Sequence, residues 1–194
     1  VDMTLAEPFA VLKTIVAIFD ALGIDYYLGG SLASSLYGTP RSTQDIDIIA
    51  TLTSEKVDDW GERLRPGFYI DTAAMYEAVR YQGSFNIIHL ATMFKIDIFI
   101  PQAALGAQRE MQRRKRQPFP HDPQSQFYIV SAEDLIANKL RWYRSGGEVS
   151  DRQWQDVKGV LHVQHGKLDF EYLQARCGEF EVSDLLALVV GEMA

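Results

Sequence analysis

The most constraining feature of this sequence is the alternation of acidic and apolar side chains in Asp-Ile-Asp-Ile-Ile, residues 45–49. Successive residues of a β-strand point to opposite faces, so Asp45 and Asp47 are expected on one face, about 7 Å apart along the strand. The isoleucines then face a core. Two carboxylates on one face repel each other, and a hard divalent cation such as Mg²⁺ relieves that repulsion. The pattern therefore predicts a half-buried strand whose outer face meets a cation.

Two further segments complete a chemical pattern. Residues 94–100 repeat the alternation and place Asp97 opposite in sense to their apolar side chains. Gly29-Gly30-Ser31 stands between a predicted strand at 24–28 and a helix at 32–37, where glycine lets backbone N–H groups approach a phosphate and the helix start adds positive charge. Each segment alone also fits a solvated strand or an ordinary turn. Together they predict two-metal phosphoryl or nucleotidyl transfer.

The basic residues allow more than one interpretation. Arg41 lies in the loop before the acidic strand, where its guanidinium can reach a phosphate or bridge to a carboxylate. Lys95 is expected to face solvent, pointing away from Asp97 and not paired with it. A run of cations forms either a solvated helix end or a surface for an RNA backbone; it comprises Arg109, Arg113, Arg114, Lys115 and Arg116. Trp142 and Tyr143 either stack on a base or complete a seam between helices.

Periodicity and capping signals predict the remaining elements. Helices are expected at 8–22, 54–64, 72–81 and 103–116, and an antiparallel pair of strands at 85–91 and 94–100. The segment 117–126, rich in proline and glutamine, is expected to be a linker. Ser131 and Ser150 are expected to cap two helices, and 168–193 is expected to be helical. The chain is thus divided into a mixed α/β core, residues 1–130, and a C-terminal helical region, residues 131–194, packed on it.

Composition excludes several classes of protein. Of 194 residues, 47% are hydrophobic and 23% charged, which is typical of a globular chain and not of a disordered one. The single cysteine cannot form an internal disulfide, so a reducing, cytoplasmic location is expected. No stretch is long and apolar enough to suggest a membrane span or a secretion signal. A net charge of −7 argues against a protein whose main task is to coat nucleic acid.

The motifs resemble those of a known superfamily. Gly30-Ser31, thirteen intervening residues, Asp45-Ile46-Asp47 and the later Asp97 are similar to the signature of the polymerase-β-like nucleotidyltransferases. The resemblance implies an α/β (α+β) nucleotidyltransferase fold, a twisted mixed β-sheet flanked by helices, with a C-terminal helical extension. It implies transfer of a nucleoside monophosphate from an NTP to a hydroxyl acceptor, with Mg²⁺, as two ions, for a cofactor. The three aspartates would be catalytic and bind metal, and Gly30 and Ser31 would form the triphosphate turn, to which the residue pattern adds Gly29 as a nucleotide-binding residue.

A finer resemblance rests on residues 37–47, 133–140 and 151–157. These stretches are similar to small bacterial proteins grouped with the AbiEii-type toxin nucleotidyltransferases. The resemblance implies a functional lysine and a functional acidic residue on successive helices, here Lys139 and Asp156, with Asp151 the second choice for the acid. A lysine suits a β- or γ-phosphate as a mobile point charge, and a nearby carboxylate can hold it. A solvated lysine and a salt bridge between helices are the alternatives.

The acceptor stays open at this point. The AbiEii-type resemblance suggests an RNA or tRNA acceptor, a toxin-like role and an antitoxin-like protein partner. The acidic net charge fits a small-molecule or protein acceptor equally well. A non-catalytic nucleotide-binding module is the alternative from another class, although three clustered carboxylates without a cation would then remain uncompensated.

Overall fold

The computed structural model describes residues 6–102, 106–120 and 122–193. The chain divides into two compact units, each built from two segments. The first contains residues 1–29 and 42–129, and the second contains residues 30–41 and 130–194. Residues 103–105 of the predicted 103–116 helix and residue 121 of the predicted linker lie outside the described residues.

The first unit holds a mixed sheet whose order is β3-β4-β5-β2-β1-β7-β6. Its strands are β1 (Tyr26–Leu28), β2 (Asp45–Ala50), β3 (Phe68–Tyr69), β4 (Ser84–His89), β5 (Lys95–Phe99), β6 (Lys115–Phe119) and β7 (Asp122–Ile129). Strand β2 runs parallel to β5 and β1 runs parallel to β7, whereas the other neighbours are antiparallel. The structure thus confirms the mixed sheet and the antiparallel pairing of β4 with β5.

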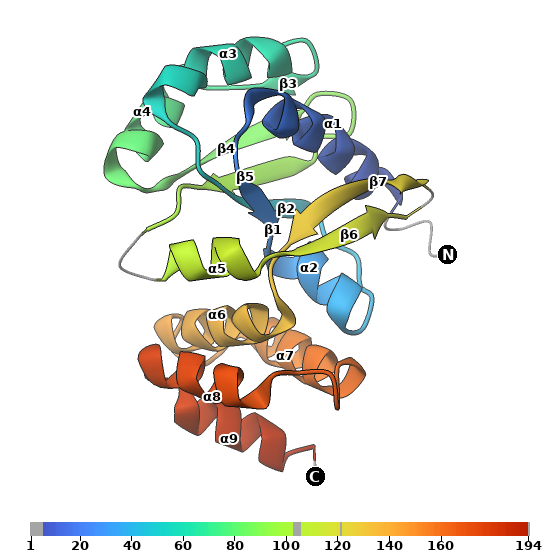
Figure 1. Ribbon diagram of the computed structural model, residues 1–194, viewed down its shortest axis with the longest axis vertical. Coiled ribbons are helices and arrows are strands. Elements are labelled where there is room, and N and C mark those ends of the chain that lie inside the picture. The colour runs from blue at the N-terminus through green and yellow to red at the C-terminus, as the bar shows by residue number, and fades with distance from the viewer. Residues whose placement is uncertain (1–5, 103–105, 121, 194) are drawn as a thin grey trace. The chain divides into compact units, whose positions relative to one another are not determined.

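Helices lie on both faces of this sheet (Figure 1). They are α1 (Ala6–Leu22), α3 (Ser54–Leu64), α4 (Thr72–Tyr81) and α5 (Ala107–Arg113). An aromatic stack fills the core under α1 and α3, where the Phe19 ring lies 5.2 Å from that of Tyr26 and 5.4 Å from that of Trp60. On the other face, the Tyr27 hydroxyl donates to the buried carboxylate of Glu110 on α5, at 2.6 Å. Both faces of β1 are therefore buried, whereas β2 and β5 bury only alternate residues and leave their other face partly exposed.

The segment after α5 differs from the prediction. Residues 115–119 form strand β6 and not the end of a helix, and residues 122–129 form β7, so the predicted linker at 117–126 is wrong where the structure describes it. The reason is the position of β6 at the edge of the sheet. An edge strand tolerates charged residues and proline, here Pro118, because one side of its backbone needs no partner. Strand β3 lies at the opposite edge, and its two residues are too few to form a recognisable alternation in the sequence.

The second unit is helical. It contains α2 (Gly30–Tyr37), α6 (Ala132–Ser145), α7 (Asp151–Val163), α8 (Phe170–Glu179) and α9 (Ser183–Gly191). The predicted caps are confirmed, because the Ser131 and Ser150 side chains accept hydrogen bonds from the backbone N–H three residues later. At the end of α2, a Cβ on Gly38 would lie 2.8 Å from the backbone of Gly159. Glycine at this position lets α2 and α7 approach closely.

The only cysteine of the sequence, Cys177, lies in the interior of the second unit on α8. Burial raises the pKa of its thiol to about 12, so the thiol is neutral and shielded at ordinary pH. Among the helices that the structure describes, none has both the length and the hydropathy required to cross a bilayer.

Candidate active site

The acidic cluster, which we define as Asp45, Asp47 and Asp97, lies on one face of the sheet in the first unit. The register of the parallel strands β2 and β5 places Asp47 directly opposite Asp97 and Asp45 opposite Lys95. The alternating isoleucines of both strands are fully buried on the other face. The Asp45 side chain is 50% exposed and that of Asp97 is 21% exposed. The predicted strand geometry thus brings two sequence-distant carboxylates into neighbouring positions.

The structure corrects the expectation for Lys95. Its ammonium nitrogen lies 2.8 Å from Asp97 Oδ2 and 3.7 Å from Asp45 Oδ1. The expectation of opposite faces was wrong because residues i and i+2 of a strand share a face. The hydrogen bond to Asp97 raises the pKa of Lys95, and the charges of all three aspartates add to the effect.

The donor set of the acidic cluster fits a hard divalent cation. Carboxylate oxygens are the ligands that Mg²⁺ prefers, and the position of the Lys95 ammonium shows that one cation contacts oxygens of both strands. Within the described part of the chain, no three His, Cys, Asp or Glu side chains are already gathered into a group that could hold a metal ion. Binding of Mg²⁺ would therefore require the aspartate side chains to converge.

The predicted glycine turn follows β1. The Gly29 N–H belongs to the sheet, where it donates to the Asp47 carbonyl oxygen at 2.8 Å. Gly30, the first residue of α2, has a φ of 58°, a left-handed conformation that favours glycine. Since the first N–H groups of a helix lack partners within it, Gly30 and Ser31 offer the backbone donors of this turn, and Gly29 does not.

The second unit contains an ion-pair cluster, defined here as Ser31, Arg41, Lys139, Gln153 and Asp156. Asp156 Oδ1 accepts from Arg41 Nε at 2.8 Å. Asp156 Oδ2 accepts from Arg41 Nη2 at 2.9 Å and from Lys139 Nζ at 2.8 Å. The Lys139 and Asp156 side chains are only 7% and 6% exposed. One carboxylate of α7 therefore holds two cations from the α2–β2 loop and from α6.

Two neighbours extend the ion-pair cluster. Arg41 Nη2 also donates to Ser31 Oγ at 2.6 Å, and Lys139 Nζ donates to Gln153 Oε1 at 3.0 Å. A serine hydroxyl that accepts a hydrogen bond from a guanidinium keeps its own proton to donate. The Ser31 hydroxyl is thereby oriented as a donor.

The electrostatics of the ion-pair cluster favour charged groups. Burial alone would raise the pKa of Asp156, but the hydrogen bonds from Arg41 and the charge of Lys139 outweigh it and hold the pKa below its ordinary value. The hydrogen bond to Asp156 in turn raises the pKa of Arg41. The carboxylate and the guanidinium therefore stay ionised near neutral pH.

Two arginines of the predicted cationic run, Arg114 and Arg116, contact other side chains of the first unit. The Arg114 guanidinium carbon lies 4.3 Å from the centre of the Tyr128 ring, and its Nη2 donates to Asp25 at 2.7 Å. Arg116 donates to the Tyr128 hydroxyl at 3.0 and 3.1 Å. These contacts support a structural role for both arginines on the first unit.

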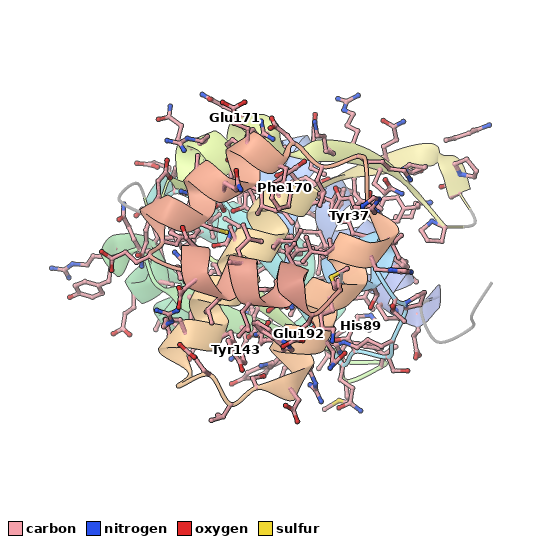
Figure 2. The ribbon with its side chains drawn as sticks, turned by 90° about the horizontal axis from the view of Figure 1, so that it is seen from below. Tyr37, His89, Tyr143, Phe170, Glu171 and Glu192 are labelled. Atoms are coloured by element: carbon pink, nitrogen blue, oxygen red, sulfur yellow. The ribbon has the colours of Figure 1, made fainter. Side chains whose placement is uncertain are left out.

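Trp142 and Tyr143, the two neighbouring aromatic residues of α6, lie in different surroundings. Tyr143 packs against Trp154 of α7 with ring centres 5.1 Å apart, and the Trp154 indole N–H donates to Glu192 at 3.1 Å. Tyr143 and Glu192 are labelled among the helices of the second unit in Figure 2. Tyr143 therefore belongs to the seam between helices, which was one of the two interpretations, whereas Trp142 is 56% exposed.

Three residues near these clusters were not predicted. Lys95 could have been found from the alternation that placed Asp97, because both are odd positions of one strand. Gln153 lies three residues before Asp156 and so on the same side of α7. Asn86 of β4 is opposite Asp97 in the antiparallel register with β5 and is exposed, a pairing that no local sequence signal reveals.

Comparison with solved structures gives the fold a name. An antigenic nucleotidyltransferase-like protein from Paracoccidioides brasiliensis is 15% identical, with a TM-score of 0.55 over 93% of this chain and 91% of that one. ANT(2")-Ia in complex with adenylyl-2"-tobramycin is 12% identical, with a TM-score of 0.58 over 91% of this chain and 98% of that one. The chain has a nucleotidyltransferase fold. Lincosamide antibiotic adenylyltransferase LnuA, lincomycin-bound, is 14% identical, with a TM-score of 0.52 over 78% and 95%.

No protein-family model matches the chain, and no curated protein matches it. The nucleotidyltransferase fold therefore rests on the arrangement of its helices and strands. The predicted fold class, a mixed sheet flanked by helices, is confirmed. The AbiEii-type subgroup is not.

Proposed function

We propose that the protein is a Mg²⁺-dependent nucleotidyltransferase that transfers a nucleoside monophosphate from an NTP to a hydroxyl acceptor. The observation that carries the proposal is the acidic cluster, in which Asp47 and Asp97 are register partners and Asp45 shares their face. Three carboxylates in this arrangement suit a site for one or two divalent ions. The nucleotidyltransferase fold supplies the support at the level of architecture.

The aspartates are proposed to act as follows. Asp45, Asp47 and Asp97 would hold Mg²⁺ through carboxylate oxygens, and Mg²⁺, when bound, supplies charge for the triphosphate and a lower pKa for the attacking hydroxyl. Asp97 is the proposed acceptor of the hydroxyl proton. The acceptor oxygen forms a bond to the α-phosphorus while the bond from that phosphorus to the pyrophosphate oxygen breaks. The products are the nucleotidylated acceptor and pyrophosphate.

The second unit is proposed to supply nucleotide-binding groups. Gly30 and Ser31 offer donors for triphosphate oxygens, with Gly29 shaping the turn, and Lys139 and Arg41 offer positive charge. Asp156 is proposed to position both cations, since its two oxygens accept from Arg41 and Lys139 at 2.8–2.9 Å. These assignments combine the contacts within the ion-pair cluster with the resemblance of the motifs.

Two acceptor classes are proposed. An RNA end, in a cytoplasmic toxin-like enzyme with an antitoxin-like partner, follows from the AbiEii-type resemblance. A small-molecule hydroxyl is favoured by a different observation, because Arg114 and Arg116, which would have been candidates for an RNA surface, are engaged with Asp25 and Tyr128. Two proteins of similar fold, LnuA and ANT(2")-Ia, are named for antibiotics, which adds small polyols to the acceptors worth testing.

The test is a transfer assay with each of the four α-³²P-labelled NTPs in turn, Mg²⁺ and a panel of acceptors. The panel contains total cellular RNA, the protein itself, an aminoglycoside and a lincosamide. We expect label on one acceptor class, with loss of transfer by about 10³-fold in Asp45→Asn/Asp47→Asn, because the ligands that support in-line displacement are removed.

The acceptor that carries the label distinguishes the proposed functions. Transfer to RNA would support the toxin-like proposal, and transfer to an antibiotic would support the small-molecule proposal. NTP binding without pyrophosphate release under any condition would contradict the enzymatic proposal and favour a nucleotide-binding module. Transfer at an unchanged rate by the double variant would contradict the assignment of the acidic cluster.

A further inference from the structure

We propose that Lys95 is a resident counter-cation of the acidic cluster, which competes with the divalent ion and sets the cation concentration at which the cluster fills. The inference rests on the proposed metal site. It concerns a lysine to which neither the motif resemblance nor the comparisons assign a role.

The ammonium group of Lys95 lies between two strands of the acidic cluster. Lys95 Nζ lies 2.8 Å from Asp97 Oδ2 and 3.7 Å from Asp45 Oδ1, and these two aspartates come from different strands. An ammonium group at this place bridges the strands as a metal ion would. Its single positive charge is shared between the carboxylates of Asp45 and Asp97.

Mg²⁺ and the Lys95 ammonium group would compete for the same carboxylate, that of Asp97. Mg²⁺ binds carboxylate oxygens at about 2.0–2.1 Å and demands regular octahedral geometry. An ion at that distance from Asp97 would lie close to an ammonium that contacts the same carboxylate, and like charges at such a separation repel strongly. A divalent ion that binds Asp97 through Oδ2 would therefore displace Lys95 from that oxygen.

The Lys95 side chain can move away from the Asp97 carboxylate into solvent. Its side chain is 45% exposed, and a lysine has a flexible four-carbon stem that reaches water easily. The exposed ion pair is individually weak. Displacement thus lowers the affinity for metal by a modest factor, and it keeps the acidic face compensated while no metal is bound.

The test measures Mn²⁺ binding by electron paramagnetic resonance of the free ion, without NTP or acceptor. We expect Lys95→Gln to bind Mn²⁺ about fivefold more tightly than wild type, since the competing charge is gone. Lys95→Arg keeps the charge and should retain weak binding. Asp45→Asn identifies binding that belongs to the acidic cluster.

Lys13→Gln is the matched control, because Lys13 is also an exposed lysine of the first unit paired with an aspartate, Asp122, at 2.6 Å. It removes the same charge and should leave the Mn²⁺ affinity unchanged. Equal or weaker binding by Lys95→Gln, at a site that Asp45→Asn abolishes, would overturn the role of Lys95 and leave the metal site standing. If no variant and no wild-type sample shows binding that depends on Asp45, the proposed metal site fails and this inference fails with it.

Discussion

The acidic cluster of the first unit and the ion-pair cluster of the second unit differ in burial and in how their charges are compensated. In the first unit, three partly exposed carboxylates share one face of the sheet, and Lys95 contacts two of them. In the second unit, the buried Asp156 carboxylate accepts hydrogen bonds from Arg41 and Lys139 at 2.8–2.9 Å. A partly exposed cluster of carboxylates can bind a cation from solution, whereas a buried charge must find its partners within the fold. The comparison predicts a functional role for the acidic cluster and a combined structural and positioning role for the ion-pair cluster.

The largest effect is expected for Asp156→Asn. Loss of the carboxylate leaves the buried Lys139 ammonium beside the Arg41 guanidinium, so the free energy of unfolding should fall by about 3 kcal/mol. Urea unfolding followed by tryptophan fluorescence measures this change. Asp151→Asn is the control on the same helix, where an exposed acidic residue contributes about 0.5 kcal/mol or less. Equal losses in the two variants would show that the ion-pair cluster is not the cause.

An acid titration sharpens the comparison. The pKa of Asp156 is below its ordinary value in the folded protein. The stabilisation it provides is therefore fully present above the unfolded pKa, about 3.9, and is lost as the pH falls through the lower folded pKa. The difference in unfolding free energy between wild type and Asp156→Asn should shrink steadily between about pH 5 and pH 2. Urea midpoints measured for both proteins in parallel cancel the titration of other carboxylates, and a constant difference would contradict the assignment.

The smallest effect on stability is expected for Asp45→Asn. The Asp45 side chain is 50% exposed and lies 3.7 Å from Lys95, so its loss removes a weak attraction and also a repulsion between carboxylates. The free energy of unfolding should change by about 0.5 kcal/mol or less, although the proposed nucleotidyl transfer should be lost. The same urea experiment measures it. A loss as large as that of Asp156→Asn would break the distinction between the two clusters.

The sequence predicts the local features well where one residue pattern decides them. The alternation around Asp45 and Asp97 follows from burial on one side of a strand, and the caps at Ser131 and Ser150 follow from hydrogen bonds three residues away. These patterns need no knowledge of distant segments. The helices at 54–64 and 72–81 are confirmed at the predicted bounds for the same reason.

Other features depend on neighbours that the sequence does not reveal. The sequence of strand β6 does not look like that of a strand, because it contains charged residues and a proline. A strand tolerates these at the edge of a sheet. Arg41 and Asp156 are 115 positions apart, so their pairing requires the packing of α2 against α7. The prediction that Lys95 and Asp97 point to opposite faces was wrong for another reason. The two-residue period of a strand already places both side chains on the same face.

The parallel pairing of β2 with β5 has a consequence for how the acidic cluster comes into existence. Asp47 and Asp97 are register partners but are separated by the whole segment that forms α3, β3, α4 and β4. Closing such a long connection is slow, and its entropy cost must be met before the strands pair. A nascent or partly unfolded chain therefore has no complete set of carboxylates. The metal affinity that we propose for the acidic cluster would therefore arise only after the two central strands have paired.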